Sequence, residues 1–247
     1  MWKLLFLGIV FLSLWALPGE ALEIRYLGHS AFFLSFESGF RCVLDPFSPE
    51  VGYSIPKSLE AHALISTHEH FDHLFEGFLG KHLTTLVGTK SKGADWNLFE
   101  ETIEGVHIFA LPSYHDEKKG TLRGKNAIIV LEGDTMRLAH LGDIGALPER
   151  EVKEKLQNVD ILFVPTGGHY TLSLDLVVKL IQELTPRVVI PMHYRTEATK
   201  DWPIAPLEEF LKRAKTWKVT EKDSPLRIRK ENLPETTEIW VMQPWTE

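Results

Sequence analysis

The sequence predicts an α+β fold in which two mixed sheets pack against each other and helices lie on the outside. The first half of the chain carries short apolar runs separated by turn residues, which is the pattern of a β-meander. The second half alternates such runs with helical segments. With 247 residues, 44% of them hydrophobic, the chain can bury a sizeable core. No linker-like stretch divides it, so we predict one domain over residues 22–247.

Turn residues separate the strands expected in the first half. The turn Gly28-His29-Ser30 joins the first two strands, and Ser38-Gly39 precedes the third. The run 61–66 has a continuous apolar core, which is typical of a buried strand. The expected strands are 22–27, 31–36, 41–44, 61–66, 83–88 and 105–111, and a weak helix is expected at 92–99.

The second half brings helices between strands. The segment 172–184 has apolar residues at helical spacing and ends before Pro186. A turn at 132–134 joins two further strands. The expected strands are 127–131, 135–141, 160–164, 188–191, 226–228 and 237–242, and the expected helices are 149–156, 172–184 and 206–214.

Residues 1–21 have the pattern of a secretory signal peptide. Lys3 supplies a positive start, the run 4–17 is apolar apart from Gly8 and Ser13, and Gly19-Glu20-Ala21 offers small residues at a cleavage site. The apolar run is short for a membrane-spanning helix. We therefore predict cleavage near Ala21 and a secreted or periplasmic protein without membrane contact after cleavage, with an uncleaved membrane anchor as the alternative.

Composition excludes several classes of function. The formal net charge of -7 argues against a nucleic-acid partner, because nucleic-acid-binding surfaces are basic. The single cysteine, Cys42, rules out a disulfide framework and a cysteine-based zinc site. The chain has no P-loop, no G-x-G-x-x-G and no G-x-S-x-G motif.

The most informative segment is Ser66-Thr67-His68-Glu69-His70-Phe71-Asp72-His73, directly after an apolar strand. In extended chain, His68 and His70 face the same side and can bind one ion. If a helix begins near Asp72, then Asp72 and His73 turn toward a second point nearby. Imidazole and carboxylate ligands suit Zn²⁺, Mn²⁺ or Fe. This segment therefore predicts a metal site.

Three further candidate ligands follow predicted strands. His115 comes after 105–111, Asp143 after 135–141 and His193 after 188–191. A rigid scaffold commonly positions its chemistry on such loops. Taken singly, each of these residues would more often be structural than a metal ligand.

These motifs resemble the metallo-β-lactamase fold superfamily, whose signature H-x-H-x-D-H reads here as His68, His70, Asp72 and His73. The downstream ligands match in order, and the segments 26–32, 141–143 and 191–194 are most similar to small metal-dependent hydrolases related to ascorbate-6-phosphate lactonase-like proteins. The resemblance covers about residues 22–196. It implies an αββα sandwich with the site at one edge of the two sheets.

The resemblance also implies a division of the ligands between two divalent ions, with Zn expected first and Mn or Fe as alternatives. One ion would be bound by His68, His70 and His115, and the other by Asp72, His73 and His193. Asp143 would bridge them, and Asp45 would orient ligands from behind. The bridging position holds an aspartate, which is unlike true β-lactamases and lowers the expectation of β-lactam hydrolysis.

The function implied is hydrolysis of a small ester, lactone or phosphodiester by a metal-bridging hydroxide. We assign catalytic roles to Asp72, Asp143 and His169, and substrate binding to His29, His169 and Tyr194. Three alternatives remain: a non-catalytic metal-binding protein on the same fold, a diiron redox protein, and a nuclease. The substrate is a small molecule of a kind that the sequence does not name, and oligomeric state stays open.

Overall fold

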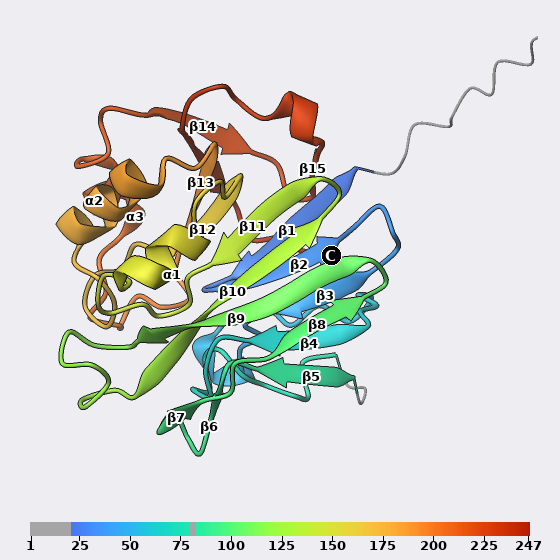
Figure 1. Ribbon diagram of the computed structural model, residues 1–247, viewed down its shortest axis with the longest axis horizontal. Helices are drawn as coiled ribbons and strands as arrows, with labels where there is room; N and C mark the ends of the chain where they lie inside the picture. Colours follow the sequence, from blue (N-terminus) through green and yellow to red (C-terminus); the bar gives the residue numbers. More distant parts are fainter. Residues whose placement is uncertain (1–20, 80–82) are drawn as a thin grey trace, which may run out of the picture.

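The computed structural model describes residues 21–79 and 83–247 and contains two large sheets packed face to face (Figure 1). One sheet has six strands and the other eight. The three α-helices of the described residues lie against the eight-stranded sheet. The predicted sandwich of two mixed sheets is therefore confirmed.

The six-stranded sheet has the order β15-β1-β2-β3-β4-β5. Strands β1, β2 and β3 form the predicted antiparallel meander, and β3, β4 and β5 run parallel. Its strands are β1 (Leu22–Gly28), β2 (Ala31–Ser35), β3 (Arg41–Leu44), β4 (Ala63–Ser66), β5 (Thr84–Val87) and β15 (Leu226–Ile228).

The eight-stranded sheet has the order β14-β16-β13-β12-β11-β10-β9-β8. Its half from β8 to β11 is antiparallel, and the half from β11 to β14 is parallel. Its strands are β8 (Glu100–Ile103), β9 (Val106–Tyr114), β10 (Lys125–Gly133), β11 (Met136–His140), β12 (Ile161–Pro165), β13 (Val188–Met192), β14 (Lys218–Lys222) and β16 (Glu238–Met242).

The main core lies between the two sheets, and strand periodicity decides which side chains enter it. On β10, Ile129 faces the opposite sheet, whereas Ile128 and Val130 face the helices. Phe32 of β2 meets Phe163 of β12 across the core, with ring centroids 4.4 Å apart. Cys42 is buried in this core, as its alternation with Phe40 and Leu44 indicates, and its thiol is free.

The outer faces of the two sheets are covered differently. The helices α1 (Arg150–Lys155), α2 (Leu174–Leu184) and α3 (Leu207–Leu211) pack apolar faces on the eight-stranded sheet, and α2 buries Val177, Leu180, Ile181 and Leu184. The outer face of the six-stranded sheet is covered by loops that carry Phe47, Leu59 and Phe78. Two short 3-10 helices, η1 (Pro49–Val51) and η2 (Lys230–Asn232), lie in connecting segments.

The predicted helix at 92–99 is wrong. The short strands β6 (Thr89–Lys90) and β7 (Asp95–Trp96) pair antiparallel there, around a turn in which Ser91 and Lys92 have positive φ. The Trp96 indole N–H donates to the backbone oxygens of Ser113 and Asn126, at 3.0 and 2.9 Å. These tertiary contacts outweigh the weak local helix signal.

The strands β8 and β14 are edge strands that the sequence did not reveal. Their sequences, EETI and KVTEK, carry charged residues that mask any apolar pattern. Charged residues are common on edge strands, where they discourage pairing with other chains.

Strand direction brings the candidate ligands together. In one sheet β1, β3 and β4 run in the same direction, and in the other β9, β11, β12 and β13 do. The carboxyl ends of these strands meet at one edge of the sandwich, which is where open α/β sheets place ligands.

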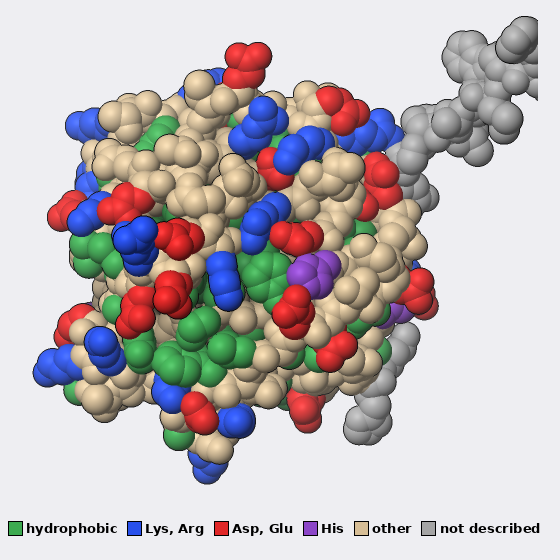
Figure 2. All heavy atoms as spheres, viewed as in Figure 1, with side chains coloured by type: hydrophobic (Ala, Val, Ile, Leu, Met, Phe, Trp, Pro, Cys, Tyr) green, Lys and Arg blue, Asp and Glu red, His purple; other side chains and the backbone are tan. Residues whose placement is uncertain are grey.

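The described residues contain no helix with the length and apolarity needed to cross a membrane. The predicted signal peptide, apart from Ala21, lies outside the described residues, and β1 begins at Leu22. Figure 2 shows acidic and basic side chains interspersed on one face of the described molecule, with no extended area of one sign on that face.

Candidate metal centre

Each of the seven predicted ligands lies just beyond the carboxyl end of a strand. His68, His70, Asp72 and His73 follow β4, His115 follows β9, Asp143 follows β11 and His193 follows β13. All except His70 are buried, with exposed fractions of 7% or less.

The segment after β4 turns back on itself without starting a helix. The backbone N–H groups of His73 and Leu74 both donate to the carbonyl oxygen of His70, at 2.9 and 2.8 Å. This single turn brings the His73 ring to 4.3 Å from the His68 ring, centroid to centroid, so the two ends of the segment stay adjacent. The ligand atoms of His68, His73 and Asp143 also lie within 4.8 Å of one another. Glu69 points elsewhere and accepts the backbone N–H of Gly93.

The side chains form two clusters. The ligand atoms of His68, His70 and His115 lie within 4.8 Å of one another, as do those of Asp72, His73 and His193, which His29 joins. In the first cluster, His68 Nε2 and His70 Nδ1 are 3.0 Å apart. In the second, Asp72 Oδ2 is 3.6 Å from His73 Nε2 and 3.9 Å from His193 Nε2.

Asp143 stands between the two clusters. Its Oδ1 is 3.1 Å from His73 Nε2, and its Oδ2 is 3.3 Å from both His115 Nε2 and His193 Nε2. One carboxylate therefore contacts ligands of both clusters, which is the position expected of a bridging ligand.

The nitrogen and oxygen atoms that face the site are arranged better for binding a metal than for hydrogen bonding to one another. His73 Nε2, His193 Nε2 and Asp143 Oδ1 are buried without a hydrogen-bond partner, although the first and third are 3.1 Å apart. A buried polar atom without a partner is costly. Imidazole nitrogens and carboxylate oxygens are ligands for Zn²⁺, Mn²⁺ and Fe, so these residues fit divalent ions.

Burial sets the charge of two histidines of the first cluster. Desolvation lowers the pKa of His68 and His115, which keeps these imidazoles neutral and able to donate a lone pair to a metal. In the second cluster, burial opposes a charge on His73, but the carboxylates of Asp143, Asp72 and Asp45 raise its pKa well above the ordinary value. The same site thus attracts positive charge.

Asp45 lies outside both clusters and positions the candidate ligands through hydrogen bonds. It is fully buried after β3 and accepts the backbone N–H of Thr67 at 2.7 Å and the Thr67 hydroxyl at 2.9 Å. Its Oδ2 is 2.6 Å from His73 Nδ1. A proton on His73 Nδ1 leaves Nε2 free to bind a metal, so Asp45 selects the tautomer that a ligand needs.

Two supporting residues were not predicted from the sequence. Thr67 also lies 2.9 Å from His68 Nδ1 through its hydroxyl. Asn126 accepts the backbone N–H of Asp143 at 3.0 Å and donates to the Leu141 carbonyl oxygen. A lone asparagine at the start of the apolar run 127–131 is the signal that could have revealed it.

The backbone is unusual at this edge. His29, Asp45 and His193 all have positive φ, at 52°, 43° and 50°. Such conformations cost of order 1 kcal/mol or more and cluster at functional sites. Gly142 has φ 53°, and a Cβ there would lie 2.4 Å from Asn126 Oδ1, so the turn before Asp143 requires glycine.

The three predicted substrate-binding residues differ in burial and in their contacts. His29 is fully buried, with Nε2 3.1 Å from Asp72 Oδ2, and burial and His193 lower its pKa to about 4. Tyr194 is 7% exposed, and burial raises its pKa to about 12. His169 is exposed and packs edge-on against Tyr170. Their contact with substrate stays a prediction.

A cavity of about 640 Å³ opens over the two clusters. This volume is in the range of small-molecule sites. Aromatic and cationic residues that the sequence analysis did not identify join four predicted ligands in its wall. The lining residues are His70, Phe71, Asp72, His115, Arg123, Asp143, Tyr170, Asp201, Trp202 and Pro203.

Comparison with known proteins agrees with this architecture. A metal-dependent hydrolase of Pyrococcus furiosus is 31% identical over 213 residues, which are 77% of this chain and 91% of the relative. A metal-dependent hydrolase of Pyrococcus abyssi is 29% identical over 213 residues, with the same shares of both chains.

A solved structure gives the same result for the fold. It is that of a candidate Zn-dependent hydrolase of the metallo-β-lactamase superfamily from Thermotoga maritima, 27% identical, with a TM-score of 0.68 over 90% of this chain and 98% of that one. The family model described as the beta-lactamase superfamily domain matches residues 23–193. The chain therefore belongs to the family that this domain model describes, and it is a metal-dependent hydrolase of the metallo-β-lactamase superfamily.

Proposed function

We propose that this protein is a dinuclear hydrolase that cleaves a small ester, lactone or phosphodiester. The observation that carries the proposal is Asp143, whose two oxygens contact histidines of both clusters. His68, His70 and His115 would bind one ion, and Asp72, His73 and His193 the other. Zinc suits this set of nitrogen and oxygen ligands best, and manganese or iron are the alternatives.

When bound, two such ions supply a water of lowered pKa and polarise the oxygen of the scissile group. The chain's own residues prepare the site. Burial keeps His68 and His115 neutral, Asp45 orients His73, and the His29 Nε2–H is placed to donate to Asp72 Oδ2. Phe71, Tyr170 and Trp202 line the cavity with aromatic side chains, which are common in small-molecule sites.

The experiment is a substrate panel assayed with chelated and reloaded protein. Chromogenic phosphodiester, lactone, thioester and β-lactam substrates are each tested after chelation and after addition of Zn²⁺, Mn²⁺ or Fe²⁺. We expect turnover of at least one of the first three that disappears on chelation and returns with metal. Metal binding without turnover of any substrate would favour the non-catalytic alternative, and oxygen consumption by the iron form would favour the redox one.

His169 provides a narrower prediction. We expect His169→Ala to retain its full metal content and to lower kcat/KM about 100-fold for substrates with poor leaving groups, because a general acid protonates such groups. The loss should shrink for 4-nitrophenol esters, which need no protonation. Steady-state kinetics on both substrate types decides this: unchanged kcat/KM with both would remove His169 from the mechanism, and lost metal would make it a ligand.

We also propose that the protein is exported and acts on a small molecule, without a nucleic-acid partner. The signal-peptide pattern of residues 1–21 and the net charge of -7 support this. N-terminal sequencing after expression in a Gram-negative host should begin at Leu22. A chain that starts at Met1 and needs detergent for extraction would indicate a membrane anchor.

A further inference from the structure

Among the described residues that line the cavity over the metal centre, one cation is not used by the proposed chemistry. Arg123 lines this cavity together with His70, Asp72, His115 and Asp143. Its guanidinium lies over the Tyr170 ring, 5.5 Å from the ring centroid. Within the described residues no carboxylate lies at ion-pair distance from it, whereas most arginines of the chain have such a partner.

A buried carboxylate holds the backbone of the loop that carries Arg123. Asp116, 1% exposed, accepts four backbone N–H groups: those of Lys118 and Gly120 at Oδ1 and those of Leu122 and Arg123 at Oδ2, at 2.8 to 3.1 Å. Because these bonds fix the backbone at Arg123 itself, the side chain starts from a defined position at the cavity. Stacking on Tyr170 restricts it further.

We propose that Arg123 binds an anionic group, a carboxylate or a phosphate, on the substrate, and so selects substrates that carry a negative charge beside the scissile bond. This rests on the proposed hydrolase function of the same site. A guanidinium presents a planar fork that matches either anion. Phe71, Tyr170 and Trp202 would contact the apolar or planar part of the same molecule.

Charge at the cavity is consistent with an anionic substrate. Asp72 and Asp143 are predicted metal ligands, and two divalent ions exceed their combined negative charge. The remaining acidic lining residue, Asp201, is exposed, so solvent and salt screen its charge. Arg123 then adds a positive charge inside a protein whose net charge is -7.

Two esters that differ by one charge test the proposal. They are 4-nitrophenyl hydrogen glutarate, which carries a free carboxylate, and its neutral methyl ester. We expect metal-loaded wild type to have a higher kcat/KM for the anionic ester than for the neutral one. In Arg123→Gln, kcat/KM for the anionic ester alone should fall about 10- to 100-fold, mainly through a higher KM, because the loss of a hydrogen bond to a charged group has an effect of this size. Arg123→Lys should recover part of the preference.

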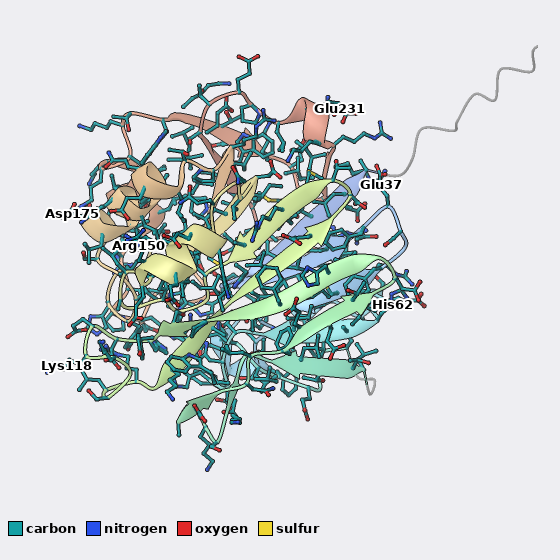
Figure 3. All side chains as sticks on the ribbon, in the orientation of Figure 1. Glu37, His62, Lys118, Arg150, Asp175 and Glu231 are labelled. Carbon is teal, nitrogen blue, oxygen red and sulfur yellow. The ribbon has the colours of Figure 1, made fainter. Side chains whose placement is uncertain are left out.

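Lys118→Gln is the matched control. It removes one positive charge from the same loop, but Lys118 is exposed at the outer end of the loop and does not line the cavity (Figure 3). We expect it to behave as wild type. Calorimetry with glutarate and with phenylphosphonate gives a readout that needs no turnover and shows which anion binds more tightly to wild type than to Arg123→Gln.

The outcomes separate the two proposals. An equal loss on both esters would make Arg123 structural, and an unchanged preference together with unchanged binding of both probes would remove it from substrate recognition. If wild type hydrolyses neither ester, the esterase form of the proposed function fails, while weaker binding of a probe by Arg123→Gln would still support the anion site.

Discussion

Asp143→Asn should lower kcat/KM by about 1000-fold while the protein stays folded. The substitution keeps the shape of the side chain and removes the charge that we propose both ions share. An ion that stabilises developing charge contributes several kcal/mol, and each 1.36 kcal/mol corresponds to a factor of ten. The amide N–H₂ would also face His73 Nε2 or His115 and His193 Nε2, where the wild type presents only acceptor oxygens.

The measurement is kcat/KM with metal content determined on the same sample. We expect circular dichroism like that of wild type and at least one retained ion, because His68, His70 and His115 remain. Asp160→Asn is the matched control: Asp160 is also buried, but it binds Lys230 and the backbone N–H of Arg137 at the far end of β12. Wild-type turnover in Asp143→Asn would mean that Asp143 is not a metal ligand.

Asp45→Asn should weaken metal binding about 10- to 100-fold, although Asp45 is not itself a predicted ligand. The asparagine oxygen can still accept the Thr67 backbone N–H, but its N–H₂ group then faces His73 Nδ1 in place of Oδ2, 2.6 Å away in the wild type. His73 must then lose this hydrogen bond or move its proton to Nε2, where it blocks ligation. Loss of a hydrogen-bond partner of a metal-binding histidine commonly lowers metal affinity about 10- to 100-fold.

Competition with a zinc chelator of known affinity measures this change. The shift should appear in one of the two binding steps, that of the ion bound by His73, while the step assigned to His68, His70 and His115 changes less. Asp160→Asn should bind metal as wild type does, even if it melts earlier. Equal weakening of both steps, or none, would show that Asp45 does not act through His73.

The sequence predicted that the candidate ligands lie together at one edge of the two sheets, because strand ends and spacing are local properties. The continuous apolar run of β4 and its end at Ser66 place the H-x-H-x-D-H segment on a loop, and His115, Asp143 and His193 each follow a strand in the same way. The strands themselves were recognisable because apolar residues follow strand periodicity, as at Ile128 and Ile129 of β10.

The cavity walls could not be predicted in this way. Arg123, Tyr170 and Trp202 lie on separate irregular segments, and only the packing of these loops at one edge brings them together. No periodicity links them to the ligands or to one another. The same limit explains the wrong helix at 92–99, where the hydrogen bonds of Trp96 to distant strands decide the conformation.

The most direct test of the two-metal account is a titration of metal-free protein with Zn²⁺, in which activity and bound metal are measured at every step. We expect bound metal to reach about two ions per chain and activity to become maximal only as the second ion binds, since both clusters and the shared Asp143 are needed. Full activity with one ion per chain would contradict the dinuclear mechanism, and failure to bind any ion would contradict the metal-dependent function itself.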